Sequence, residues 1–151
     1  MDEKMKTTLL TVFCILIIVG SFITMQYARS ISSQQTIELV DISFKAPRGY
    51  SYLNDSYESG ASESNNGTTF HRILLQNQDN QIIELTQYEN VLQLSDDALF
   101  DLNDIPVHKN VAESLDPYEF NFSGKGYTIR TPQGYDNQLV EEIVSSMKVK
   151  Q

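Results

Sequence analysis

The chain has 151 residues, with 20 acidic against 11 basic side chains and a formal net charge of −9. An acidic chain is repelled by phosphate backbones and anionic lipid headgroups, so the composition argues against nucleic acid as a partner. The only cysteine is Cys14, which excludes a disulfide elsewhere in the chain. A domain of this size buries enough apolar surface to fold without a disulfide or a metal ion.

An uncharged apolar segment, TTLLTVFCILIIVGSFITM, covers residues 7–25. As a helix it would extend about 28 Å, close to the roughly 30 Å hydrocarbon thickness of a bilayer. A cleaved signal peptide and a lipoprotein signal are the alternatives. A cut after Ser21 is disfavoured because the apolar sequence continues through Met25, and a cut after Ala28 is disfavoured because the bulky Gln26 stands where a small residue is expected. A lipoprotein signal needs a small residue before its cysteine, and Phe13 precedes Cys14. We therefore predict a retained transmembrane helix.

The basic residues that flank this segment predict its orientation. Lys4 and Lys6 precede it, and Arg29 is the nearest basic residue after it. Because the flank richer in Lys and Arg stays in the cytoplasm, we expect a single-pass protein of the cell membrane with its C-terminal domain outside. The predicted organisation is a cytoplasmic tail over residues 1–6, a transmembrane helix over 7–25, a tether over 26–35 and an extracytoplasmic α+β domain over 36–151.

Apolar residues alternate through the first half of the domain, which indicates strands. Residues 37–44 alternate with one slip of phase, as a bulged strand would, and Pro47 and Gly49 end that strand. The other elements predicted here are a short strand over 50–53, a polar surface loop over 54–67, and a hairpin of strands over 69–76 and 81–88.

The second half begins with Ser95, Asp96 and Asp97 ahead of an apolar run, which predicts a short N-capped helix over residues 95–102. An edge strand over 106–111 follows. Residues 118–130 predict a hairpin with an aromatic face, closed at residues 123–126. A last helix is expected from the N-cap Asp136 to about Lys148. Its apolar stripe consists of Leu139, Val140, Ile143, Val144 and Met147.

These elements together predict an α+β fold: an N-terminal transmembrane helix followed by an antiparallel sheet with the C-terminal helix packed on one face. The opening over residues 42–50 (ISFKAPRGY), the hairpin over 118–131 and the helix over 137–149 resemble an uncharacterised extracytoplasmic domain family. That family stands at the C-terminal ends of anti-sigma-factor-like and single-pass membrane proteins, mostly of Gram-positive bacteria. The resemblance implies an extracytoplasmic accessory or sensing domain without enzymatic activity, and it assigns no functional residue.

No catalytic, cofactor-binding or metal-binding residue is predicted. His71 and His108 lie in separate predicted strands, and no serine or thiol stands beside either. The acidic residues that cluster most densely have neither the alternating spacing nor the glycine of a calcium loop, and no Cys and His pattern suits zinc. These acidic residues are Asp96, Asp97, Asp101 and Asp104.

Three tyrosines surround the predicted polar loop: Tyr50, Tyr52 and Tyr57. Aromatic side chains are favoured at interfaces, so these residues predict either a binding surface or part of the core. The leading functional expectation is a membrane-anchored, non-catalytic binding, sensing or accessory module that contacts an envelope or membrane protein. The alternatives are an envelope hydrolase with a site assembled from dispersed residues, and a small structural subunit of a membrane complex.

Overall fold

The computed structural model describes residues 11–21, 23, 34–63, 66–94, 97–110, 117–132 and 136–151. The chain divides into two units, Met1–Gln34 and Gln35–Gln151, which are described separately. The predicted tail over residues 1–6 and residues 26–33 of the predicted tether lie outside the described residues.

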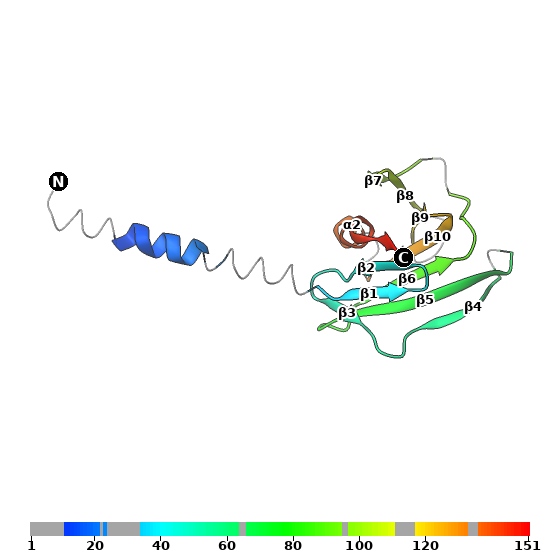
Figure 1. Ribbon diagram of the computed structural model, residues 1–151, viewed down its shortest axis with the longest axis horizontal. Coiled ribbons are helices and arrows are strands. Elements are labelled where there is room, and N and C mark those ends of the chain that lie inside the picture. Colours follow the sequence, from blue (N-terminus) through cyan, green and yellow to red (C-terminus); the bar gives the residue numbers. More distant parts are fainter. Residues whose placement is uncertain are drawn as a thin grey trace. The chain divides into compact units, whose positions relative to one another are not determined.

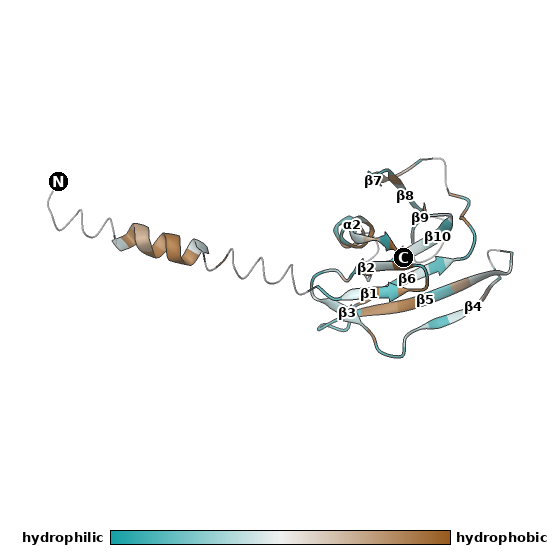
Figure 2. Ribbon diagram, in the orientation of Figure 1, coloured by the Kyte–Doolittle hydropathy of each residue, from teal (hydrophilic) through white to brown (hydrophobic). Residues whose placement is uncertain are grey.

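In the first unit, the described residues are helical over 11–21 and at 23, and Figure 2 shows this helix as mostly apolar. Within the part of the chain that the structure describes, no helix is both long and apolar enough to cross a membrane. This finding corrects the prediction of a transmembrane helix over residues 7–25, of which 7–10, 22 and 24–25 lie outside the described residues.

The second unit is built on a large antiparallel sheet (Figure 1). Its strands run in the order β3-β5-β6-β10-β9-β8-β7, and β4 pairs with β5 on the same side as β3. The strands are β3 (Tyr50–Tyr52), β4 (Glu58–Ser62), β5 (Thr68–Asn77), β6 (Ile82–Tyr88), β7 (Phe100–Leu102), β8 (Ile105–Lys109), β9 (Tyr118–Phe122) and β10 (Lys125–Arg130).

A second layer covers one face of this large sheet. It consists of a small sheet in the order β1-β2-β11 and of the helix α2 (Asn137–Ser146), which lies against β2 and β7. The strands of the small sheet are β1 (Thr36–Leu39), β2 (Ile42–Lys45) and β11 (Lys148–Val149). Figure 1 shows β1, β2 and α2 on the same side of β5.

The core lies between these two layers. Alternate residues of each strand of the large sheet point into the core, because successive side chains of a strand face opposite ways. On the covering layer, the small sheet and α2 contribute the apolar residues that meet them. The core includes Ile37, Leu39, Ile42, Phe44, Ile73, Leu75, Ile83, Leu85, Tyr118, Phe120, Tyr127, Ile129, Val140, Ile143 and Val144, all at most 5% exposed. Opposite them, the outer face of the large sheet carries Arg72, Glu84, Thr128 and Arg130.

The helix α2 begins where the sequence predicts. Asp136 is the N-cap and accepts a hydrogen bond from the Leu139 backbone N–H (3.2 Å), so this prediction is confirmed. The Tyr118 hydroxyl donates to Asn137 Oδ1 (2.7 Å), which holds the start of the helix on β9. The helix ends at Ser146 rather than near Lys148, because the chain becomes extended at Met147 and enters β11.

The predicted α+β fold with one sheet is wrong. The described residues form two antiparallel sheets and two short helices, so strands dominate. Residues 37–44 are not one bulged strand: the slip of phase is a two-residue turn at Val40 and Asp41 that divides β1 from β2. Because of that turn, β1 and β2 pair with each other in the small sheet, which is a separate layer from the large one.

Two further elements differ from the sequence prediction. The loop predicted over residues 54–67 contains β4, which pairs with β5 along five residues. Instead of a helix over 95–102 there is the β7–β8 hairpin, whose turn residues Asn103 and Asp104 have φ of 49° and 65°. Two consecutive residues with positive φ are typical of the tight hairpin turn. Ser95 and Asp96 of the predicted helix lie outside the described residues.

Val40 introduces backbone strain into the β1–β2 turn. Its φ is 37°, a left-handed conformation that a β-branched residue adopts at a cost of about 1–3 kcal/mol. Glycine adopts that conformation freely but loses about 0.5–1 kcal/mol more conformational entropy on folding. The side chain is 41% exposed, so its removal sacrifices little apolar burial.

We therefore expect Val40→Gly to stabilise the protein by about 1 kcal/mol and to raise the thermal midpoint by several degrees. Thermal unfolding followed by circular dichroism measures the change. The control is Val91→Gly, at a valine that is 58% exposed and has no positive φ. Since the control has no strain to relieve, it should lower the midpoint. A lower midpoint for Val40→Gly as well would show that the turn stores no strain.

Candidate functional site

A groove runs along β1, where the small sheet ends above the large one. Its cavity of about 290 Å³ is lined by Gln35, Thr36, Ile37, Glu38, Tyr52, Tyr57 and Ile73. In the part of the chain that the structure describes, β1 pairs with β2 and with no other strand, so its second edge is open. This groove is the candidate functional site.

The pairing register shows which backbone groups lie on the open edge of β1. The Ala46 N–H donates to the Gln35 carbonyl oxygen (2.9 Å), so Gln35 is a hydrogen-bonded position of the pairing. Every second residue of β1 repeats this position, which gives the bonded pairs Ile37–Phe44 and Leu39–Ile42. In an antiparallel pair, the residues between such bonded positions direct their N–H and C=O groups away from the partner strand. Thr36 and Glu38 therefore present their backbone groups at the open edge.

Two of the three predicted tyrosines line the opposite side of the groove. Tyr57 is 51% exposed, and Tyr52 is held near β1 because its backbone N–H donates to the Gln35 side-chain oxygen (3.0 Å). Ile73, a core residue that is 2% exposed, also lines the cavity. Tyr50 and Tyr52 both pack against the core, but Tyr50 does not line this cavity. The structure therefore places Tyr52 and Tyr57 at one concave surface and leaves Tyr50 outside its lining.

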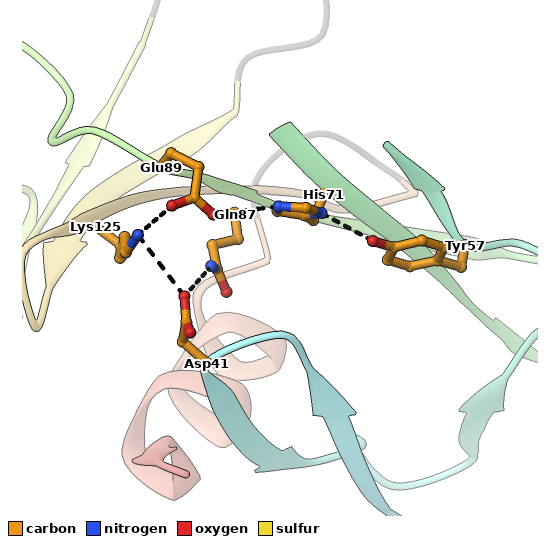
Figure 3. Close-up of polar contacts among 6 residues, drawn as sticks. All are labelled: Asp41, Tyr57, His71, Gln87, Glu89 and Lys125. Carbon is orange, nitrogen blue, oxygen red and sulfur yellow. Dashed lines mark hydrogen bonds and ion pairs between the residues drawn. The ribbon is translucent and has the colours of Figure 1, made fainter. Parts of the chain in front are cut away.

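A chain of polar side chains leads from Tyr57 across the sheet (Figure 3). The Tyr57 hydroxyl lies 2.8 Å from His71 Nδ1, and His71 Nε2 lies 3.2 Å from Glu89 Oε1. The rings of Tyr57 and His71 also stack, with centroids 6.1 Å apart. The imidazole therefore fixes the position of the Tyr57 ring in the groove, and Glu89 fixes the imidazole.

The same row of polar side chains continues to the β1–β2 turn. Glu89 Oε2 is paired with Lys125 Nζ, which lies 3.8 Å from Asp41 Oδ2. Gln87 Nε2 donates to that same Asp41 oxygen (2.9 Å). Figure 3 shows Asp41 on the turn, directed toward Gln87 and Lys125 of the large sheet. Asp41 therefore joins the covering layer to β6 and β10.

The charges of this chain support one another. The Lys125 ammonium holds the pKa of the Glu89 carboxyl below its ordinary value, and the hydrogen bond with His71 acts in the same direction. The Glu89 carboxylate in turn raises the pKa of Lys125, with a smaller contribution from Asp41. Each group is thus held in its charged form over a wider range of pH than in an unfolded chain.

Two buried polar atoms lie beside Asp41. Gln87 Oε1 and the Tyr127 hydroxyl are fully buried, and neither has a hydrogen-bond partner within the described residues. Their residues face each other in the β6–β10 pairing. Burial raises the pKa of the Tyr127 hydroxyl, and the carboxylates of Asp41 and Glu89 raise it further. An unsatisfied buried polar atom lowers the free energy of unfolding by about 1–3 kcal/mol, so these two atoms destabilise this end of the fold.

The chemistry available at the groove follows from this arrangement. A hydroxyl, an imidazole and a carboxylate stand in the order that a nucleophile, a general base and its orienting group require. The same order also holds a tyrosine hydroxyl ready to donate or accept a hydrogen bond from a molecule in the groove. Glu89 and Lys125 are functional candidates that the sequence did not single out, and His71 is a histidine to which the sequence assigned no function.

The remaining candidates from the sequence lie elsewhere. His108 is on β8 and donates from Nδ1 to the Asp97 backbone oxygen (3.2 Å). It therefore does not belong to the row of hydrogen-bonded side chains that contains His71. Asp101 and Asp104 lie on the β7–β8 hairpin, and Asp96 lies outside the described residues. Among the residues described, no three His, Cys, Asp or Glu side chains are grouped closely enough to hold a metal ion.

Comparison of the chain with family models, with curated proteins and with solved structures gives no match. The resemblance to the extracytoplasmic domain family, drawn from short sequence segments, therefore stays a prediction.

The Glu89–Lys125 pair predicts how stability depends on pH. Because the pKa of Glu89 is lowered on folding, its contribution is present above the ordinary value of about 4.3 and is lost as the pH falls through the lowered pKa. Because the pKa of Lys125 is raised, its contribution is present below about 10.4 and is lost as the pH rises through the raised pKa. The pair is therefore fully stabilising between these limits.

Glu89→Gln should lower the thermal midpoint at pH 7 and have a progressively smaller effect as the pH falls toward 2 and the Glu89 carboxylate of the folded protein becomes protonated. The side chains are 35% and 26% exposed, so solvent screening limits the difference to about 1 kcal/mol. Thermal unfolding of both proteins across that pH range measures it. The same loss of stability at pH 2 and at pH 7 would show that the ion pair does not stabilise the fold.

Proposed function

We propose that residues 35–151 form a non-catalytic binding module that takes an extended polypeptide segment along β1. The observation that carries the proposal is the open edge of β1 facing two tyrosines across one groove. An open strand edge pairs readily with an added strand, because the backbone groups at the edge are already aligned. Thr36 and Glu38 would supply these backbone groups.

The opposite wall of the groove supplies side-chain contacts. Tyr52 and Tyr57 offer apolar ring surface with a polar tip, a combination favoured at protein interfaces. His71 already holds the Tyr57 ring in place, with 2.8 Å between His71 Nδ1 and the hydroxyl oxygen. Since a fixed side chain loses little entropy on binding, Tyr57 is the expected main contact.

Charge favours a segment that carries a basic residue. Glu38 lines the groove with a side chain that is 66% exposed, and the whole chain has a net charge of −9. Lys150 Nζ lies 2.9 Å from the Glu38 carboxylate, so a basic residue of the ligand would compete with Lys150 for it. The overall acidic charge also speeds the approach of basic segments.

The expected partner is a protein of the bacterial envelope, as the resemblance to the extracytoplasmic domain family implies. That location is part of the proposal and is supported by the sequence resemblance alone. The open edge and its tyrosines do not depend on it.

Peptide hydrolysis is the second candidate function. It is favoured by one observation, the order of Tyr57, His71 and Glu89 at hydrogen-bond distances. In that mechanism the Tyr57 oxygen would attack the carbonyl carbon of a bound peptide while His71 accepts the hydroxyl proton. His71 would give that proton to the departing amine as the C–N bond breaks, and water would then release the acyl group from Tyr57. The two candidates share the groove and differ in whether the bound segment leaves intact.

The test is selection of binding peptides from a displayed random library with the full chain as bait, followed by calorimetric titration of the selected peptides. We expect alternating apolar residues with at least one Lys or Arg in the selected sequences. Thr36→Pro removes an N–H from the open edge, and Tyr57→Ala removes the main contact. Each should weaken binding by about 1 kcal/mol or more.

Leu99→Ala serves as the control, because Leu99 is also a large exposed apolar residue (46%) and does not line the groove. It should leave the affinity unchanged. Mass spectrometry of the recovered peptide separates the two candidates: an intact peptide supports binding alone, and a cleaved one supports hydrolysis. Failure to select any peptide, or unchanged affinity in Thr36→Pro, would contradict the proposal.

A further inference from the structure

The side chains of β1 alternate between two faces, which fixes where the side chains of an added strand lie. Ile37 is 5% exposed and belongs to the core, whereas Thr36 and Glu38 are exposed on the other face of the small sheet. Residues directly opposite each other in a strand pair share a face. A strand added at the open edge therefore places one residue beside Ile37, on the core side. The two residues that flank it lie beside Thr36 and Glu38, on the solvent side.

The position opposite Ile37 faces the groove. Ile37 lines the cavity of about 290 Å³, and Tyr52 and Tyr57 line it from outside the small sheet. Tyr57 is 51% exposed, and its ring stacks on the ring of His71, with 6.1 Å between the centroids. Aromatic rings offer apolar surface to a carbon-rich side chain. An apolar residue is therefore favoured opposite Ile37.

The position opposite Glu38 favours a positive charge. The Glu38 side chain is 66% exposed, and its neighbour on β2 is the uncharged Ser43. Opposite charges that face each other across a strand pair are stabilising, and like charges are destabilising. Lys150 Nζ already lies 2.9 Å from the Glu38 carboxylate, so an ammonium group can reach it. A Lys or Arg of the added strand would take the place of Lys150.

The position opposite Thr36 has the reverse preference. Thr36 pairs with Lys45 of β2, and the Lys45 side chain is exposed. Because paired residues share a face, Lys45 places positive charge on the same face as this position. A basic residue is therefore disfavoured opposite Thr36 and favoured opposite Glu38. The edge of β1 is thus electrically asymmetric along its length.

On the basis of the proposed polypeptide groove, we infer that the bound segment carries a Lys or Arg immediately before an apolar residue. A strand that runs antiparallel to β1 passes Glu38 first, then Ile37 and then Thr36. Antiparallel pairing is the more stable arrangement per residue, and every strand pair that the structure describes is antiparallel. Glu38 is therefore the residue that determines specificity, because it selects both the charge and the direction of the segment.

The test uses three peptides of identical composition, each with one Lys and one Leu among threonines. Lys stands directly before Leu in the first peptide, directly after Leu in the second, and two residues before Leu in the third. With Leu opposite Ile37, Lys meets Glu38 only in the first peptide. Titration into the full chain at pH 7, followed by NMR of the backbone amides, should give a dissociation constant roughly two- to fivefold lower for the first peptide than for the others.

Two variants should change this preference in opposite directions. Glu38→Gln removes the carboxylate, so the three peptides should bind alike. Lys150→Met removes the ammonium that competes for Glu38, so the preference for the first peptide should increase. Glu141→Gln is the matched control, because Glu141 is exposed on α2 and does not line the groove. It should leave the preference unchanged.

The outcomes separate this inference from the groove proposal. Equal binding of the three peptides, tightest binding of the second or third, or a preference for the first that survives Glu38→Gln would overturn the inference and leave the groove proposal standing. If none of the three peptides binds, the groove proposal is overturned together with the inference.

Discussion

The fold depends on the burial of one face of the large sheet. Leu75, Ile83 and Leu85 at its centre are 0% exposed, and burying apolar surface contributes about 25 cal/mol per Å². The cover comes from the two ends of the domain, a hairpin at its start and a helix at its finish. These ends are joined where β11 pairs with β2 and where the Lys150 N–H donates to the Asp41 carbonyl (2.8 Å). The core therefore closes only when segments more than a hundred residues apart meet, as in the bond from the Lys45 N–H to the Ser146 hydroxyl.

The proposed groove follows from this one-sided burial. The small sheet stops at β1, which leaves an open strand edge above β5 and beside Tyr52 and Tyr57. On the outer face, Arg72 pairs with Glu58 and Glu84, and Glu84 pairs with Arg130, so four adjacent strands carry alternating charge. A row of ion pairs keeps that face in water and prevents a further layer from packing there.

The sequence predicts best where periodicity and turn chemistry agree. The hairpins around residues 77–81 and 123–124 and the N-cap Asp136 are found as predicted, because polar turn residues or a capping carboxylate mark each of them. The β1–β2 turn was missed since Val40 occupies a position where glycine or asparagine would signal a turn. Asn103 and Asp104 did carry such a signal, but the acidic residues before them suggested a helix. The polar chain of the groove could not be predicted as a whole, because Asp41, Tyr57 and Lys125 come from distant segments. His71 and Glu89 lie on the two strands of the predicted hairpin, so the strand register could have predicted that they lie close together.

In the part of the chain that the structure describes, β1 has one bonded edge and one open edge, and amide hydrogen exchange tests this most directly. The N–H groups of Ile37 and Leu39 point toward β2, whereas those of Thr36 and Glu38 point away from it. The account predicts slow exchange at Ile37 and Leu39 and fast exchange at Thr36 and Glu38, measured residue by residue with NMR on the full chain. Equal protection of all four amides would contradict the account, because it would show that the edge proposed to receive a ligand is already covered.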